Sequence, residues 1–173
     1  MSRFGVLETP IGRVGVAAEL GTVTRVVFMR ERSIDTAQSL LGVPSSTARC
    51  DQLFGLLERF ERYFEGEITA LNSVPVAPQG TAFQRLVWEG LCRVGVGTTC
   101  SYGELARSIG RPKASRAVGA ANGANPIPIV IPCHRVIGAS GRLIGYSSGL
   151  DIKAWLLAHE EGGPAQPSLP LGP

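Results

Sequence analysis

The chain has 173 residues, 44% of them hydrophobic and 18% charged, which fits one compact domain or two small ones and excludes wholesale disorder. It contains no run of roughly 20 apolar residues and no apolar run near its first residue, so we expect a cytoplasmic protein without membrane contact. The net charge of +3 comes from residues 81–160, where nine Lys and Arg stand against four Asp and Glu, an excess that permits nucleic-acid binding without requiring it.

The first 30 residues have the pattern of a small antiparallel sheet. Residues 4–8, 13–18 and 23–29 are predicted as strands, because short apolar and β-branched runs are separated by turn residues. Residues 9–12, Thr-Pro-Ile-Gly, are the clearest of these turns. Residues 31–46 give no clear pattern.

An amphipathic helix is predicted over residues 47–64, where leucines and phenylalanines recur at three- and four-residue spacing. Residues 74–80 contain two prolines and a glycine, cannot continue a helix, and are predicted as a linker. The chain thus divides into two parts of different character.

The second part begins with helix signals. Thr81 can cap a helix whose inward face includes Phe83, Val87 and Leu91, and Ser101 can cap a short helix over residues 102–109. Gly110-Arg111-Pro112 ends that helix, and residues 113–124, rich in Ala and Gly, can form another. Two short helices joined by a tight turn fit either a helix-turn-helix or an ordinary helical hairpin.

The following segment, residues 126–132, is apolar, and we expect it to be extended, buried and rigid. It ends at Cys133-His134-Arg135, and a Gly- and Ser-rich loop then covers residues 138–149. Asp151 is expected to be the N-cap of a last helix that reaches Glu160. The Gly- and Pro-rich residues 162–173 are predicted to be a disordered tail.

Four cysteines and two histidines show no metal-ligand spacing, so no metal site is predicted. The thiols are expected to be free in a reducing compartment. Cys92 and Cys100 are expected to be buried residues without a catalytic role, and Cys50 to lie in the core or on the surface.

Cys133 and His134 are a candidate catalytic pair. Adjacent side chains of a strand point to opposite faces, so the two can cooperate only if the chain turns there or a water bridges them. Pro132 allows such a turn. A histidine near a thiol stabilises the thiolate, and a carboxylate on the far ring nitrogen fixes the tautomer. Glu160 is the best candidate for that carboxylate, although a Cys-His pair taken alone is usually accidental, so the surrounding residues must decide.

The surrounding residues resemble one known family. Residues 131–138, Ile-Pro-Cys-His-Arg-Val-Ile-Gly, resemble the signature of the O6-alkylguanine-DNA alkyltransferases. Residues 101–106 resemble the first helix of that family's helix-turn-helix, and Arg116-Ala117-Val118-Gly119 with Asn122 resemble its recognition helix. Residues 125–126, 145–147 and 155–160 also match, so the resemblance runs almost continuously from about residue 83 to residue 160.

The resemblance implies an α/β chain of the α+β kind. A ribonuclease H-like domain is expected over residues 1–78, and a mostly helical domain with a helix-turn-helix over residues 79–161. The implied activity is direct DNA repair, in which the alkyl group of O6-alkylguanine, and of O4-alkylthymine, passes irreversibly to Cys133 once per molecule. The implied partner is double-stranded DNA, bound from the minor groove by a monomer with the damaged base flipped out, and no cofactor is expected.

The resemblance also assigns roles to individual residues. Cys133 resembles the alkyl acceptor, and His134 its base, acting through a water and oriented by Glu160. Asn125 resembles a hinge that joins the helix-turn-helix to the active site. Tyr102 resembles the residue that pushes the 3′ phosphate to rotate the nucleotide. The predicted DNA contacts are Ser101, Tyr102, Lys113, Arg116, Ala117 and Asn122, with Arg116 filling the gap left in the base stack.

The predicted base pocket consists of Val136, Tyr146, Ser147 and Ser148. The Val136 carbonyl resembles the group that meets the guanine amino group, and the Ser147 N–H resembles the donor to O6. Ser148 stands where many members of the family have glycine, and a side chain there is expected to narrow the rim against bulky adducts such as benzyl.

Three other functions fit parts of the sequence. A non-catalytic sensor of alkylated DNA would use the same helix-turn-helix, but such proteins replace the cysteine that is present here as Cys133. A transcriptional regulator would need a sensor or dimerisation domain, and none is evident. A papain-type thiol hydrolase would need its histidine far from the cysteine in sequence, whereas His134 is adjacent.

Overall fold

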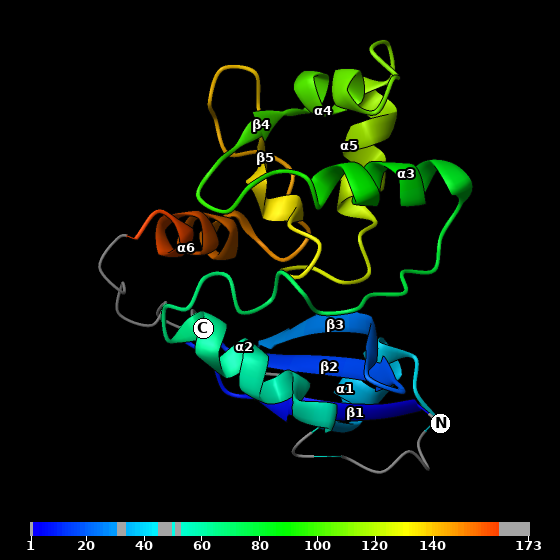
Figure 1. Cartoon of the computed structure of the whole chain (residues 1–173), viewed down its shortest axis with the longest axis vertical. Helices are drawn as coiled ribbons and strands as arrows, with labels where there is room; N and C mark the ends of the chain where they lie inside the picture. Colours follow the sequence, from blue (N-terminus) through cyan, green and yellow to red (C-terminus); the bar gives the residue numbers. More distant parts are fainter. Residues whose placement is uncertain (1, 31–33, 45–49, 51–52, 163–173) are drawn as a thin grey trace. The chain divides into compact units, whose positions relative to one another are not determined.

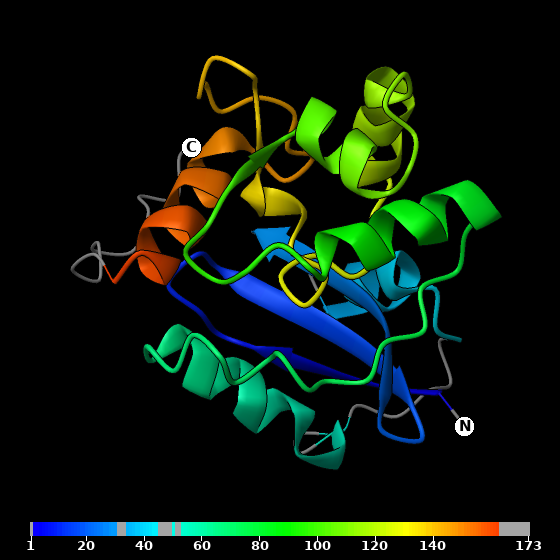
Figure 2. The same ribbon diagram turned by 45° about the horizontal axis from the view of Figure 1, so that its top comes forward.

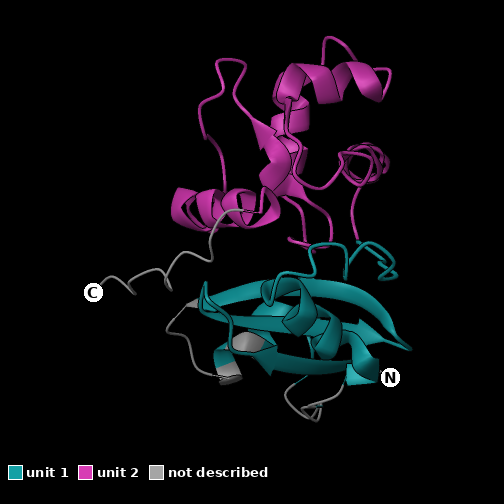
Figure 3. Ribbon diagram, turned by 60° about the vertical axis from the view of Figure 1, so that its left-hand side comes forward, with its two compact units in different colours: residues 1–78, 165–173 teal, residues 79–164 magenta. Residues whose placement is uncertain are grey.

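The computed structural model describes residues 2–30, 34–44, 50 and 53–162. These form two compact units, which divide after residue 78 (Figure 1, Figure 3). The first contains a three-stranded sheet with helices, and the second contains four helices and a pair of short strands. The chain is therefore of the mixed α+β class. None of the described helices combines the length and apolar character needed to cross a membrane.

The sheet of the first unit consists of β1 (Ser2–Leu7), β2 (Arg13–Glu19) and β3 (Thr22–Arg30), antiparallel in the order β1-β2-β3. The three predicted strands are confirmed, and so is the predicted turn of residues 9–12 before β2. In that turn the Gly12 N–H donates to the Thr9 carbonyl oxygen over 3.0 Å. Leu20 (φ 47°) and Gly21 (φ 81°) form the hairpin between β2 and β3, where positive φ matches the twist of the strands.

Helices pack on both faces of this sheet (Figure 2). Phe4 of β1 packs with Leu41, at the end of α1 (Ile34–Leu41). The next residue, Gly5, points to the other face, where a Cβ would lie 2.6 Å from Leu57 of α2 (Leu56–Phe64). Successive residues of β1 thus face two different helices, Phe4 facing α1 and Gly5 facing α2. The absence of a side chain at Gly5 lets α2 pack close to the strand.

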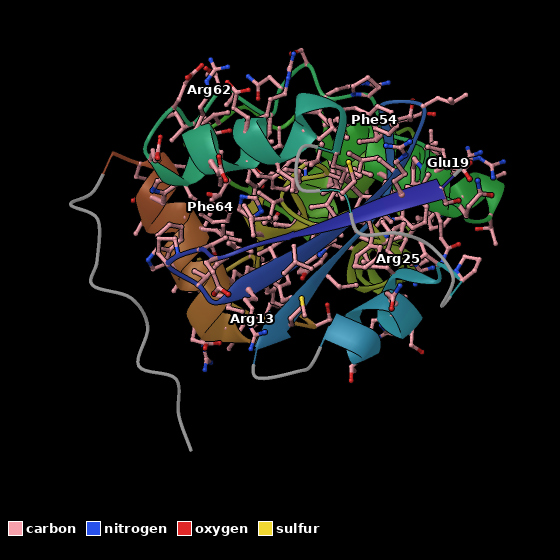
Figure 4. The ribbon with its side chains drawn as sticks, turned by 90° about the horizontal axis from the view of Figure 1, so that it is seen from below. Arg13, Glu19, Arg25, Phe54, Arg62 and Phe64 are labelled. Atoms are coloured by element: carbon pink, nitrogen blue, oxygen red, sulfur yellow. The ribbon has the colours of Figure 1, made fainter. Side chains whose placement is uncertain are left out.

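The helix predicted over residues 47–64 begins later than expected. A 3₁₀ turn, η1 (Leu53–Gly55), precedes α2, and positive φ at Phe54 (61°) and Gly55 (73°) separates the two. Residues 47–49 and 51–52 lie outside the described part of the chain. The far end of α2 matches the prediction, and Arg62, labelled in Figure 4, donates there to Glu67 over 2.8 Å.

The predicted linker of residues 74–80 is non-helical, as expected, but it also pairs with the sheet. The Val23 N–H donates to the Pro75 carbonyl oxygen, and the Ala77 N–H donates to the Val23 carbonyl oxygen, both over 2.9 Å. Val76 therefore forms a parallel bridge with Val23. The backbone before residue 78 is held by the first unit rather than left free.

Three helices form one side of the second unit: α3 (Ala82–Leu91), α4 (Tyr102–Ser108) and α5 (Ser115–Gly123). Thr81 and Ser101 cap α3 and α4 as predicted, each in a reciprocal capping box. Trp88 of α3 donates from its indole Nε1 to the carbonyl oxygen of Ala121 in α5 over 2.8 Å. The buried helix faces and this hydrogen bond fix α5 against α3.

The other side contains α6 (Leu150–Glu160), the 3₁₀ turn η2 (Cys133–Arg135) and β5 (Val136–Ile137), which pairs in parallel with β4 (Cys100–Ser101). In Figures 1 and 2, η2 and β5 lie between α6 and the three other helices of this unit. The prediction that Asp151 caps α6 is wrong: the cap position is Gly149, and Asp151 lies in the first turn. The predicted disordered tail lies beyond residue 162, outside the described residues.

Residues 126–132 are largely buried, as predicted, but they are not extended. Ile129 has φ 74°, and the Ile131 N–H donates to the Ile127 carbonyl oxygen over 2.9 Å, which closes a tight turn. A β-branched residue rarely adopts this left-handed conformation, because its side chain crowds the backbone. The burial of Ile129 within the core holds it there. The segment thus returns the chain to η2.

Candidate active site

Cys133 opens η2 directly after a turn centred on Pro132. Pro132 has φ −81° and ψ 63°, close to an inverse γ-turn, and the Cys133 N–H donates to the Ile131 carbonyl oxygen over 2.8 Å. The proline ring favours this φ. Because the chain turns here, as Pro132 allows, Cys133 and His134 do not alternate as they would in a strand. Asn122 Nδ2 lies 3.4 Å from the Cys133 carbonyl oxygen and donates to it.

The carboxylate of Glu160 accepts hydrogen bonds from both residues that follow Cys133. His134 Nε2 lies 2.8 Å from Oε1, while Arg135 Nε lies 2.8 Å from Oε2 and Arg135 Nη2 lies 3.0 Å from Oε1. All three side chains are buried. The predicted contact between His134 and Glu160 is present, and Arg135 is a third member that the sequence reasoning missed.

The ionisation of Glu160 determines the state of the imidazole. Burial acts to raise the pKa of Glu160, but hydrogen bonds from His134 and Arg135 outweigh it and hold that pKa at about 2. An ionised carboxylate only accepts, so His134 Nε2 carries the proton and Nδ1 carries the lone pair. Burial lowers the pKa of His134, which keeps the ring neutral at pH 7. Nδ1 is buried and has no hydrogen-bond partner among the described residues.

Cys133 is 4% exposed, and burial raises the pKa of its thiol to about 11. It is therefore protonated at neutral pH. The polar side chains of Asn125 and Tyr146 and the positive charge of Lys153 act in the opposite direction. The site thus holds a neutral thiol among groups that favour the thiolate, beside a neutral base with an open nitrogen.

Asn125 lies just after α5 and bridges the turn that leads to Cys133. Its Nδ2 donates to the Ile131 carbonyl oxygen over 2.8 Å, and its Oδ1 accepts from the Ile127 N–H over 3.0 Å. The same side chain acts to lower the pKa of Cys133, so it lies beside the thiol. One amide therefore connects the end of α5 with the turn that leads to Cys133.

Lys153 of α6 is a candidate that the sequence reasoning did not identify. Its side chain is fully buried, and Nζ donates to the carbonyl oxygens of Val136 over 2.6 Å and of Ile144 over 2.7 Å. Burial lowers the pKa of Lys153, and the nearby Cys133 acts to raise it. This cation joins the strand after the nucleophile to the loop of residues 138–149.

Tyr102, the first residue of α4, connects α5 with the same loop. A Cβ on Gly119 would lie 3.7 Å from its ring, which shows how closely the ring approaches α5. Its hydroxyl donates to the Ile144 carbonyl oxygen over 3.4 Å. Burial raises the pKa of Tyr102, as does the nearby Cys133, so the hydroxyl stays a donor at neutral pH. Tyr102 is therefore close enough to the Cys133 thiol for a charge on one to affect the ionisation of the other.

The predicted DNA contacts of α5 fall into two groups. Arg116 and Ala117 are exposed in the first turn of α5, and Lys113 is exposed in the turn before it, so all three can contact a ligand. Asn122 is 2% exposed and donates to Cys133 instead, so its prediction as a DNA contact is wrong. It lies one turn after Val118 on the inward face of the helix. Ser101 is half-buried and its hydroxyl caps α4.

The four predicted pocket residues lie on or beside the loop that Lys153 anchors. Val136 is buried, Tyr146 and Ser148 are half-buried, and Ser147 is exposed. The Val136 carbonyl oxygen accepts from Lys153, yet a carbonyl has a second lone pair for another donor. The Val136 carbonyl oxygen can therefore still accept a hydrogen bond from a ligand.

The remaining thiols differ from expectation. Cys92 is exposed and Cys100 half-buried, so the prediction that both are buried is wrong. Cys50 is half-buried. Within the described ranges, no three His, Cys, Asp or Glu side chains gather as metal ligands would.

Acidification is expected to destabilise the second unit in two stages. The pKa of His134 lies below its ordinary 6.5, so stability falls as the pH drops below 6.5, because the unfolded chain takes up the proton first. Glu160, with a pKa of about 2 against 4.5, adds a loss on the order of 3 kcal/mol as the pH falls through that interval. Urea unfolding across this pH range checks both stages. Glu160→Gln should lack the loss of stability at the lower pH. If the wild type also lacks that loss, Glu160 is not an ionised, hydrogen-bonded carboxylate in the folded protein.

The chain matches known proteins in sequence and in structure. Residues 82–162 match the family described as 6-O-methylguanine DNA methyltransferase, DNA binding domain. A methylated-DNA–protein-cysteine methyltransferase of Methanosarcina acetivorans is 45% identical, over 91% of this chain and 97% of that protein. Mycobacterium tuberculosis OGT, solved in complex with DNA, has a TM-score of 0.81 at 38% identity, covering 94% of this chain and 96% of that one. The O6-methylguanine-DNA methyltransferase of Pyrococcus kodakaraensis has a TM-score of 0.64 at 27% identity, covering 92% and 99%.

Proposed function

The chain belongs to the methylated-DNA–protein-cysteine methyltransferases, enzymes of direct DNA repair, and from this premise we propose that Cys133 is the residue that accepts the alkyl group. The observation that carries the proposal is the buried Cys133 thiol next to a neutral His134, whose Nε2 is bound to Glu160 and whose Nδ1 is open. A thiol, a base and a carboxylate that orients the base form an activated nucleophile.

The proposed reaction is a displacement at a saturated carbon. His134 Nδ1 takes the thiol proton through a bridging water, and the sulfur attacks the alkyl carbon of O6-alkylguanine. A carbon–sulfur bond forms as the carbon–O6 bond breaks, and the proton ends on the restored guanine. The product is a thioether, which none of the described groups of the site is placed to hydrolyse, so each molecule acts once. O4-alkylthymine offers the same carbon–oxygen bond and is included in the proposal.

The high pKa of Cys133 fits this order of events. A thiol with a pKa of about 11 stays protonated until a base removes its proton. Lys153, Asn125 and Tyr146 then stabilise the anion as it forms, since each favours the charged state of the sulfur. The nucleophile is thus activated inside the site rather than held as a free thiolate.

DNA is the proposed partner, bound by the N-terminal end of α5 and by Tyr102 and Ser101 of the α4 start. The turn between α4 and α5 supports a helix-turn-helix. Exposed Lys113 and Arg116 suit phosphates, while the exposed Ala117 permits close approach to a sugar edge. We place this helix in the minor groove, where base edges are read poorly, and expect little sequence preference.

The target base must leave the duplex stack to reach the sulfur of Cys133, a residue that is only 4% exposed. Val136 and Ser147 are proposed to hold the flipped base, through the carbonyl of the first and the N–H of the second. Tyr146 and Ser148 complete the rim, and Tyr102 rotates the nucleotide. Asn125 is the proposed hinge, because its amide spans the turn from α5 to Cys133.

The domain proposals follow the same resemblance. Residues 1–78 are proposed as a ribonuclease H-like domain. Their antiparallel sheet, with helices on both faces, supports this proposal. Residues 79–161 are proposed as the domain that binds DNA and accepts the alkyl group. Action as a monomer in the cytoplasm, without a cofactor, stays a prediction.

Intact mass tests the proposed function. Incubation with a duplex that contains O6-methylguanine should add one methylene to the protein, with peptide mapping at Cys133 and saturation at one per molecule. A sensor or regulator would bind the duplex without gaining mass, and a thiol hydrolase would cleave an ester repeatedly. Either result with folded protein would overturn the assignment.

Arg116→Ala is expected to slow repair of a lesion in duplex DNA by about 10- to 100-fold, because unstacking a base costs a few kcal/mol that the inserted side chain offsets. Repair of the free base O6-methylguanine should change little, since nothing has to be flipped. Single-turnover rates with both substrates measure the difference. Arg85→Ala, which removes an exposed cation from α3, is the matched control. Equal losses on both substrates would argue against a role in flipping.

A further inference from the structure

Arg135 contacts the same carboxylate as His134. Its Nε and Nη2 donate to the two oxygens of Glu160 over 2.8 and 3.0 Å, and its Nη1 donates to the Val94 carbonyl oxygen over 2.6 Å. A guanidinium that binds both oxygens fixes the plane of a carboxylate as well as its position. Arg135 is 7% exposed, so salt and water screen this pair little.

The two donors meet on one oxygen. Oε1 of Glu160 accepts from His134 Nε2 and from Arg135 Nη2, whereas Oε2 accepts from Arg135 Nε. The negative charge of the carboxylate is therefore shared between an imidazole and a permanent cation. A carboxylate paired with the imidazole alone would stabilise an imidazolium more strongly.

We propose that Arg135 is a positioning residue for alkyl transfer, which orients Glu160 and limits how strongly that carboxylate holds a proton on His134. This inference rests on the proposed roles of Cys133 and His134. With Arg135 in place, the imidazole is fixed with its Nε2 on Glu160 and stays neutral, so Nδ1 remains open. Without Arg135, Glu160 loses the two hydrogen bonds from the guanidinium and can rotate away from that geometry.

The charged groups around the imidazole act in opposite directions. Burial, Arg135 and Lys153 lower the pKa of His134, while the hydrogen bond and charge of Glu160 raise it. Glu160 and Lys153 belong to α6, and Arg135 to η2. The thiol of Cys133 in η2 and that of Cys92, which interacts with Arg135, are also near this cluster, and burial raises the pKa of both. Tyr102 lies near Cys133, and burial raises its pKa as well.

Single-turnover methyl transfer from duplex DNA, measured against pH, tests the proposal. Arg135→Gln should lower the optimal rate by about 10²-fold, the cost of misplacing a reacting group by ~1 Å. Its acid-side midpoint should move to higher pH, because His134 loses a neighbouring cation. Arg135→Lys keeps the charge but not the contact with both oxygens, so its rate should fall while the midpoint stays. A rate that drops equally at every pH in Arg135→Gln would overturn the proposal.

A double-mutant cycle with Glu160→Gln separates action through the carboxylate from any other effect. If Arg135 acts through Glu160, Arg135→Gln should cost far less in the Glu160→Gln background than in the wild type, and additive losses would overturn the proposal. A wild-type rate in Arg135→Lys would overturn the orienting role even if Arg135→Gln does not fold. Failure of the proposed function looks different, because the wild type itself would then leave Cys133 unmodified.

Discussion

Cys133→Ala is expected to abolish alkyl transfer while leaving DNA binding intact. Alanine removes the sulfur and leaves His134 and Glu160 in place, so the site keeps its base but has no nucleophile. With excess duplex containing O6-methylguanine, the wild type should gain one methylene and stop, and the variant should gain none. Fluorescence anisotropy should show a Kd changed by less than about threefold, or under 1 kcal/mol, because the exposed residues of α5 are untouched.

Cys92→Ala is the matched control for that result. Cys92 is the exposed cysteine, and burial of part of its side chain together with Glu89 raises its pKa, so it is a poor thiolate at neutral pH. This variant should accept one methyl group per molecule as the wild type does. A mass gain in folded Cys133→Ala, mapped to Cys92 or Cys100, would refute Cys133 as the acceptor.

The helices with strong local signals were predictable from the sequence. Thr81 with Gln84 and Ser101 with Glu104 are capping boxes, which satisfy free N–H groups within one turn and need no distant partner. The turn at Pro132 was predictable for the same reason, since proline fixes φ locally. The pair of His134 and Glu160 required more, because 26 residues separate them, and it followed from the chemistry expected of a Cys-His pair.

The missed features depend on contacts between distant segments. Ile129 adopts a positive φ that no β-branched residue favours, and its burial in the core outweighs the local preference. The resemblance implies that Asn122 contacts DNA, yet the buried carbonyl oxygen of Cys133 accepts a hydrogen bond from its amide. In the sequence, Arg135 and Lys153 look like ordinary charged surface residues. Nothing local reveals that Arg135 donates to the carbonyl oxygen of Val94, or Lys153 to that of Ile144, in loops outside their own elements.

Lys153→Met is expected to separate stability from activity. The substitution leaves the carbonyl oxygens of Val136 and Ile144 without their buried donor, at about 1–3 kcal/mol each. The substitution also removes a fully buried ammonium group that pairs with no carboxylate among the described residues. Because burying that charge costs free energy, its removal offsets part of the loss from the two carbonyl groups. The net loss in the free energy of unfolding should therefore be only about 2 kcal/mol, measured by urea unfolding.

Alkyl transfer by Lys153→Met should fall much further, by on the order of 10²-fold, because two effects act on one step. The pKa of Cys133 rises further when the cation that lowers it is gone, and the loop of residues 138–149 loses its anchor. Arg142→Met, which removes an exposed cation from the same loop, should leave both quantities near wild type at saturating DNA. Lys153→Gln keeps donor hydrogens without the charge. If it recovers stability but not rate, the charge is what the thiolate requires, whereas a wild-type rate in Lys153→Met would exclude both effects.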